Sequence, residues 1–138
     1  MKIFLAILCL IGLSEAKVFS RCALANELIA KGIPRDDIRD WVCLVEGESG
    51  RNTNKKGGPN RNGSFDHGLF QINDKYWCKN GVKGGDCNIK CEDVRQDDIT
   101  EAVKCALKIK RRHGYNAWYG WKRHCKNKPL ANVNSCLN

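Results

Sequence analysis

Cysteine content limits the folds open to this chain more than any other property of its sequence. The 138 residues include nine cysteines. One of them, Cys9, lies in an apolar run from Ile3 to Leu13 that follows Lys2 and precedes Ser14-Glu15-Ala16. A basic start, a short apolar run and small residues at the −3 and −1 positions predict a secretory signal peptide over residues 1–16.

Cleavage after Ala16 removes Cys9 and leaves an even number of cysteines. The eight that remain are Cys22, Cys43, Cys78, Cys87, Cys91, Cys105, Cys125 and Cys136. An even count in an exported chain predicts four disulfides, although spacing alone allows about 105 pairings. The alternative is a zinc site built from Cys87, Cys91 and the three histidines, His67, His113 and His124. No CxxC pair is present in the sequence, so we favour disulfides and expect no metal ion and no cofactor.

Size and charge narrow the class of protein further. After residue 16 no apolar run approaches the ~20 residues that cross a bilayer, and no linker or repeat divides residues 17–138. We therefore expect one secreted, soluble, monomeric domain. Cleavage removes one Lys and one Glu, so the mature chain keeps the net charge of +9, which favours an anionic partner such as a bacterial surface. No RNP, zinc-finger or basic-zipper pattern is present, and we expect no nucleic-acid binding.

The second of two predicted N-terminal helices, beginning near residue 34, carries a carboxylate on its apolar face. Ile38, Trp41 and Val45 recur at i, i+3 and i+7, and Glu48 follows at i+10, whereas Glu46 falls off this face and is expected at the surface. Poor solvation disfavours a charged carboxylate and raises its pKa, as a general acid near neutral pH requires. The alternative is a surface Glu at a frayed helix end.

A second carboxylate follows a predicted turn. Asn62-Gly63 is typical of a hairpin turn and indicates a small antiparallel sheet, with Asp66 in the strand after the turn. Nearby amides, including Asn60 and Asn73, would hydrogen-bond the ionised carboxylate. Two carboxylates in opposite environments form the acid/base pair that glycoside hydrolysis uses. The alternative is that Asp66 is a turn residue bonded to its own backbone.

The rest of the chain is predicted to be mainly helical. Asp98-Ile99-Thr100-Glu101 has the pattern of a capping box, and a last short helix is expected to hold Trp118 and Trp121. Tryptophan rings stack well on sugars, but a pair at i, i+3 is more typical of a core. The basic residues 108–113 are expected on a solvated helix face or at a helix end.

Several segments together resemble a known family. They are residues 17–22 (KVFSRC), 41–43 (WVC), 48–49 (ES), 63–73 (GSFDHGLFQIN), 76–78 (YWC) and 116–118 (NAW). These resemble the chicken-type (c-type) lysozymes, glycoside hydrolase family 22, and above all their insect members. The resemblance covers the whole mature chain, and all eight cysteines match in order.

The resemblance implies an α+β fold of two lobes, one mostly helical and one containing a small three-stranded antiparallel sheet, with a saccharide cleft between them. It also implies a pairing of the cysteines: Cys22–Cys136, Cys43–Cys125, Cys78–Cys91 and Cys87–Cys105. The activity it implies is that of a secreted antibacterial muramidase, which cleaves the β-1,4 bond between N-acetylmuramic acid and N-acetylglucosamine in peptidoglycan with retention. Chitin oligosaccharides are a second expected substrate.

The resemblance also assigns roles to individual residues. Glu48 stands where the family has its general acid, and Asp66 where it has its nucleophile or ion stabiliser. Trp118 should form the apolar wall that keeps Glu48 protonated, and Asn60 and Asn73 should hold Asp66. The residues expected to bind the sugars are Asn60, Gln71, Asn73, Tyr76, Trp77, Ala117 and Trp118.

Three positions depart from the family pattern. One extra residue lies between Glu48 and Asp66, with residues 57–59 as the expected place. His67 replaces the Tyr that usually follows the second carboxylate, where it would alter the hydrogen bonds of Asp66 or add a titrating group near the cleft. Residues 110–113 occupy the loop in which many relatives carry an acidic sugar-binding residue, so the outermost sugar contacts should differ.

Two other kinds of protein remain as alternatives to the enzyme. The related α-lactalbumins share the fold but lack the catalytic pair and bind calcium. Ala102 sits where one calcium ligand should be, so both criteria favour the enzyme. The other alternative is a non-catalytic saccharide binder or a cationic membrane-disrupting protein, and the charge of +9 leaves membrane disruption open as an added activity. The basic pI favours defence in body fluids over digestion.

Overall fold

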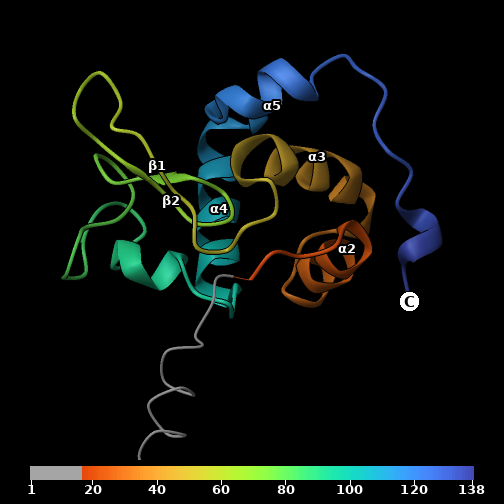
Figure 1. The fold of residues 1–138 in the computed structure, drawn as a ribbon, viewed down its shortest axis with the longest axis horizontal. Helices are drawn as coiled ribbons and strands as arrows, with labels where there is room; N and C mark the ends of the chain where they lie inside the picture. The colour runs from red at the N-terminus through yellow and green to blue at the C-terminus, as the bar shows by residue number, and fades with distance from the viewer. Residues whose placement is uncertain (1–16) are drawn as a thin grey trace, which may run out of the picture.

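The structure is a computed structural model that describes residues 17–138 (Figure 1). The predicted signal peptide, residues 1–16, lies outside the described residues. In the view of Figure 1 the small sheet lies to one side of helix α4, and helices α2 and α3 lie to the other. This arrangement confirms the expected α+β fold, with a helical lobe and a three-stranded antiparallel sheet.

The first helix, α2, spans Arg21–Ala30. The Ser20 side chain caps it by accepting a hydrogen bond from the N–H of Ala23 at 3.2 Å. Gly32 follows with φ of +110°, a backbone conformation that glycine adopts without steric cost, and the chain turns back there. The helix therefore ends just before the turn at Gly32.

Helix α3 spans Ile38–Ser49 and presents the predicted apolar face to the core. The sequence placed its start near residue 34, but Pro34 is followed by a separate 3-10 turn, η1, over Arg35–Asp37. Gly50 ends the helix in the left-handed conformation. Glu48 is therefore in the last turn of a complete helix, and not at a frayed end.

The sheet has three two-residue strands in the order β1-β2-β3, which are Lys56–Gly57, Asp66–His67 and Ile72–Asn73. Both pairings are antiparallel, with Gly57 opposite Asp66 and Asp66 opposite Asn73. The predicted turn closes between Asn60 and Gly63, where the Gly63 N–H donates to the Asn60 carbonyl at 2.9 Å.

The second half of the chain contains the 3-10 turn η2 (Cys91–Val94), helix α4 (Thr100–His113), η3 (Tyr115–Ala117), helix α5 (Tyr119–His124) and η4 (Asn134–Cys136). Two expectations need correction here. The basic residues 110–113 form the last turn of α4, which confirms the helix end expected from their charge pattern and corrects the loop that the resemblance implied. The predicted last helix is divided by Trp118, which has an extended backbone between η3 and α5.

The start of α4 also differs from a capping box. The carboxylate of Asp98 accepts hydrogen bonds from the backbone N–H and the hydroxyl of Thr100, at 3.0 and 2.6 Å. The Glu101 side chain pairs with Lys104 and does not reach back to the Asp98 backbone. Of the two reciprocal hydrogen bonds of a capping box, only the one accepted by the Asp98 side chain is therefore formed.

Aromatic side chains join the two lobes in one core. The Trp41 ring of α3 is almost fully buried and meets Phe70, Tyr115 and Trp118 edge-on at centroid distances of 5.5–5.7 Å. Four disulfides brace this core, Cys22–Cys136, Cys43–Cys125, Cys78–Cys91 and Cys87–Cys105, the same pairs that the resemblance implies. Among residues 17–138, no helix has the length and apolar character needed to cross a membrane.

Candidate active site

A cleft of about 370 Å³ runs between the sheet and the helices. Its lining comes from the end of α3, the 60–64 turn, strands β2 and β3, the following loop, α4 and the segment from η3 to α5. The residues that line it are Glu48, Asn60, Asn62, Ser64, Asp66, Gln71, Ile72, Asn73, Tyr76, Trp77, Ile109, Ala117, Trp118 and Tyr119. All nine residues that the sequence analysis assigned to catalysis or sugar binding are among them.

Glu48 enters the cleft from the last turn of α3 and is half-buried. Burial is the largest influence on this carboxyl and raises its pKa above the ordinary value of 4.5. The backbone N–H of Gly120 donates to Oε2 at 2.8 Å and opposes the rise, while the nearby charge of Asp66 adds to it. Glu48 therefore holds its proton to a higher pH than an exposed glutamate does.

Asp66 enters the cleft from β2 and accepts one amide on each carboxylate oxygen. Asn60 Nδ2 donates to Oδ2 at 3.1 Å, and Asn73 Nδ2 donates to Oδ1 at 2.9 Å. Both amides also donate to the Ser64 hydroxyl, at 3.0 and 2.9 Å, and that hydroxyl donates to Asn62 Oδ1 at 2.6 Å. These donors satisfy the charged form of the carboxylate and fix its orientation.

Trp118 contributes aromatic surface to the cleft that Glu48 also lines. Its side chain is 4% exposed, and its indole N–H donates to the Phe70 carbonyl at 2.9 Å, so one edge is fixed in the core while the other borders the cleft. Tyr76 also lines the cleft and is 56% exposed. The cleft thus offers rigid aromatic surface, which suits sugar rings.

The amino-acid sequence matches one family over almost its entire described length. A model of the C-type lysozyme/alpha-lactalbumin family matches residues 17–136. The chain belongs to that family. It is 56% identical over 133 residues to a lysozyme of Bombyx mori, covering 96% of this chain and 94% of that one. It is 50% identical over 141 residues to lysozyme c-1 of Anopheles gambiae, covering 99% and 100%.

A solved structure of a family member gives the same result for the fold. The crystal structure of lysozyme from Equus asinus superposes with a TM-score of 0.74 at 41% sequence identity, covering 82% of this chain and 92% of that one. These matches confirm the resemblance to insect c-type lysozymes. Full-length relatives at this identity give the chain the activity of a lysozyme, a glycoside hydrolase also called a muramidase.

His67 does not lie where the departure from the family pattern suggested. Its side chain is fully buried and lies outside the cleft lining, because neighbouring residues of a strand point to opposite faces and Asp66 takes the cleft face. The ring Nε2 bonds Asp74 Oδ2 at 3.0 Å. Among the described residues, the His67 side chain makes its hydrogen bond with Asp74 and not with Asp66, and it does not line the cleft.

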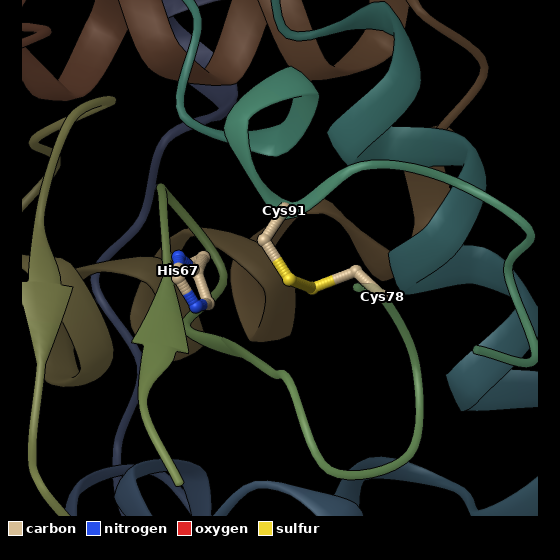
Figure 2. Close-up of side chains that lie close together, drawn as sticks. All are labelled: His67, Cys78 and Cys91. Carbon is tan, nitrogen blue, oxygen red and sulfur yellow. A yellow bond between two sulfur atoms is a disulfide. The ribbon is translucent and has the colours of Figure 1, made fainter. Parts of the chain in front are cut away.

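His67, Cys78 and Cys91 lie close enough together to suggest a metal site, and Figure 2 shows why they do not form one. The two cysteine sulfurs are joined in the Cys78–Cys91 disulfide, so neither is a thiolate that could bind zinc. Cys87 of the alternative zinc site is likewise paired, with Cys105. These cysteines therefore stabilise the loop behind the sheet.

Sequence reasoning missed two groups that hold the carboxylates. Ser64 accepts both amides that orient Asp66, and its place after the Asn62-Gly63 turn was the available signal. Gly120 supplies a backbone N–H to Glu48, and its own Cα approaches so closely that an added Cβ would lie 2.2 Å from Oε2. No sequence pattern indicates a backbone donor contributed from 72 residues away.

Proposed function

We propose that this protein is a secreted muramidase in which Glu48 is the general acid and Asp66 the nucleophile or ion stabiliser. The observation that carries this proposal is the contrast between two carboxyls in one cleft. Burial raises the pKa of Glu48, whereas two amides bind the charged form of Asp66. A pair that differs in this way is what cleavage of a glycosidic bond requires.

In the proposed reaction the protonated Glu48 donates its proton to the bridging oxygen between N-acetylmuramic acid and N-acetylglucosamine. The bond from that oxygen to the sugar carbon breaks, and Asp66 stabilises or captures the sugar cation from the opposite side. Glu48, now ionised, then takes a proton from the water that attacks the same carbon, and the anomeric configuration is retained. Lysozymes are the type case of this chemistry, and these steps are carried over from the family.

The sugar-binding roles follow from the position of each side chain in the cleft. Tyr76, Trp77 and Trp118 offer ring surface to the saccharide, and Gln71 and Ala117 complete the wall. Asn73 and Asn60 have a second duty, because their amide nitrogens already donate to Asp66. We therefore assign Asn60 mainly to positioning Asp66.

Export and charge suggest where the enzyme works. The predicted signal peptide over residues 1–16 would deliver it to the extracellular space, where four disulfides persist. The net charge of +9 would draw a monomeric protein to the anionic surface of a bacterium. We propose an antibacterial defence role, with peptidoglycan as the principal substrate and chitin oligosaccharides as a second.

The experiment compares the oxidised mature protein with Glu48→Gln and Asp66→Asn on a Gram-positive cell-wall suspension. Two quantities are followed, the clearing of the suspension and the release of reducing sugar. We expect the wild-type protein to show both, and Glu48→Gln to lose both while its circular dichroism spectrum stays unchanged.

Reducing sugar separates hydrolysis from the non-enzymatic alternatives. Binding to walls without release of reducing sugar by the wild-type protein would refute the glycosidase and indicate a saccharide binder. If the Glu48→Gln and Asp66→Asn proteins both still kill bacteria, membrane disruption by the basic surface is indicated as an additional activity.

A further inference from the structure

The C-terminal end of α4 brings two basic side chains to one end of the cleft. Ile109 lines the cleft, and on a helix the residues three and four positions further along lie on the same side. Those residues are Arg112 and His113. The Arg112 guanidinium lies 5.7 Å from the centroid of the Trp77 ring, and the His113 ring meets Trp77 edge-on at 5.8 Å. Trp77 itself lines the cleft.

The guanidinium of Arg112 is held in place but is not saturated. Its Nη1 donates to Asp86 Oδ2 at 2.5 Å, and its Cζ lies over the Trp77 ring. Of the five N–H donors of an arginine, those on Nε and Nη2 have no acceptor among residues 17–138. The two partners of the ion pair keep exposed fractions of 46% and 55%, so a ligand can reach the free donors.

The charge balance around this end of the cleft is positive. Tyr76 and Trp77 are neighbours in the cleft wall. The Lys75 ammonium lies over the exposed Tyr76 ring, 5.3 Å from its centroid. Asp86 is paired with Arg112, while Lys108 is bound to the Asp86 backbone carbonyl. An anionic group carried by a saccharide would be attracted here, and an uncharged saccharide would gain nothing from these charges.

We propose that Arg112 is the centre of a carboxylate-binding site at the Trp77 end of the cleft, which favours anionic glycan strands over uncharged chitin. A planar fork of N–H donors matches the two oxygens of a carboxylate, and the Trp77 ring and Asp86 hold that fork in advance. The carboxylate is that of the muramic acid lactyl ether or of a peptide stem. The proposal rests on the proposed function, because the same cleft must bind the glycan.

The chain provides a matched control in the neighbouring residue. Arg111 belongs to the same turn of α4 and carries the same charge, but it lines a separate groove of about 170 Å³ beside the Cys87–Cys105 disulfide. Removing its charge changes the net charge of the protein as much as removing that of Arg112. Of these two arginines, Arg112 is the one that lies over Trp77 in the cleft wall.

The experiment measures binding in a Glu48→Gln background, so that no ligand is hydrolysed. Arg112→Gln, Arg112→Lys and Arg111→Gln are titrated with three probes of equal glycan length: chitin hexasaccharide, peptide-free peptidoglycan hexasaccharide, and the same strand bearing peptide stems. For Arg112→Gln we expect the Kd of a carboxylate-bearing probe to rise about threefold to fivefold relative to that of chitin. Arg112→Lys should give a smaller rise, because lysine keeps the charge and loses the fork.

A rise with the peptide-free strand assigns the site to the lactyl carboxylate, and a rise only with the peptide-bearing strand assigns it to the stem. The proposal is overturned if Arg112→Gln weakens chitin binding equally, or if Arg111→Gln has the same effect as Arg112→Gln. About 1 M salt should reduce a genuine difference, because it shortens the Debye length to ~3 Å and screens exposed charges that are farther apart than this. A wild-type protein that cleaves none of the probes would refute the proposed function, and the Kd values would still test the site.

Discussion

Replacing Glu48 by Gln should make the folded protein more stable while it removes the activity. Gln has nearly the same shape, and its side-chain oxygen can accept the Gly120 N–H that now donates to Glu48 Oε2 at 2.8 Å. The packing against the cleft wall is therefore preserved. What disappears is a carboxyl that burial and the neighbouring charge of Asp66 make costly to ionise.

The expected gain follows from proton linkage. Because folding raises the pKa of Glu48 above its ordinary value of 4.5, the folded wild-type protein is destabilised once this group ionises. Each pKa unit corresponds to about 1.4 kcal/mol. Single stabilising substitutions commonly gain about 0.5–2 kcal/mol, and we expect Glu48→Gln to fall in this range at pH 7.

The sign of the pH dependence is the sharper test. The gain should be present at neutral pH, shrink as the pH falls through the raised pKa of Glu48, and vanish below about 4.5, where the carboxyl is protonated in both states. Thermal unfolding measured at several pH values gives this curve, with about 4 °C expected for each kcal/mol in a domain of this size. The rate of reducing-sugar release should fall by about 10²- to 10⁴-fold.

Glu46→Gln is the control, since this residue lies two positions earlier on α3. The sequence placed Glu46 on the solvated surface, but its carboxylate accepts two hydrogen bonds from Arg21, at 2.9 and 3.1 Å, and pairs with Arg51 at 3.2 Å. Its replacement should lower the stability and leave the activity intact. The reasoning about Glu48 is wrong if Glu48→Gln destabilises the protein at pH 7, or if its gain does not change with pH.

Two further substitutions test how the cleft is supported. Gly68→Ala should destabilise the protein by about 2–4 kcal/mol in urea unfolding, because φ is +76° and the added Cβ would lie 1.9 Å from the Val94 carbonyl oxygen; a loss below about 1 kcal/mol would contradict this. Trp118→Phe should cost about 1–3 kcal/mol by leaving the buried Phe70 carbonyl without its donor. The same change should admit water beside the acid, lower its pKa and move the alkaline limb of the pH–rate profile to lower pH; an unmoved limb would count against the apolar wall.

Local patterns in the sequence were sufficient for the elements that carry the two carboxylates. The apolar repeat of α3 runs from Ile38 to Val45, and extending its period by one turn reaches Glu48. The Asn62-Gly63 signal gave the turn before Asp66. Neither pattern contains the information that the two side chains share one cleft, since that depends on packing between the lobes. Only the family resemblance supplied it.

The sequence analysis misplaced helix boundaries where a favourable helical pattern is interrupted by one residue. Pro34 begins a helical turn, but the chain completes only one 3-10 turn over Arg35–Asp37 before α3 begins. Trp118 interrupts the last predicted helix with an extended backbone, and its indole donates a hydrogen bond to the Phe70 carbonyl, a partner 48 residues away. Helix propensity depends on the local sequence and does not predict such a tertiary contact.

His67 marks a different kind of error, in which the sequence contained the answer. Asp66 was placed in a strand facing the saccharide, and side chains alternate between the two faces of a strand, so the next residue had to face away from the cleft. A histidine on that inner face needs a polar partner, and Asp74 lies one residue beyond Asn73, which is opposite Asp66 in the antiparallel register. Strand alternation predicts that His67 faces away from the cleft, and the observed register explains why Asp74 is its partner. A residue next to a catalytic group should accordingly be assigned to a face before it is assigned a role.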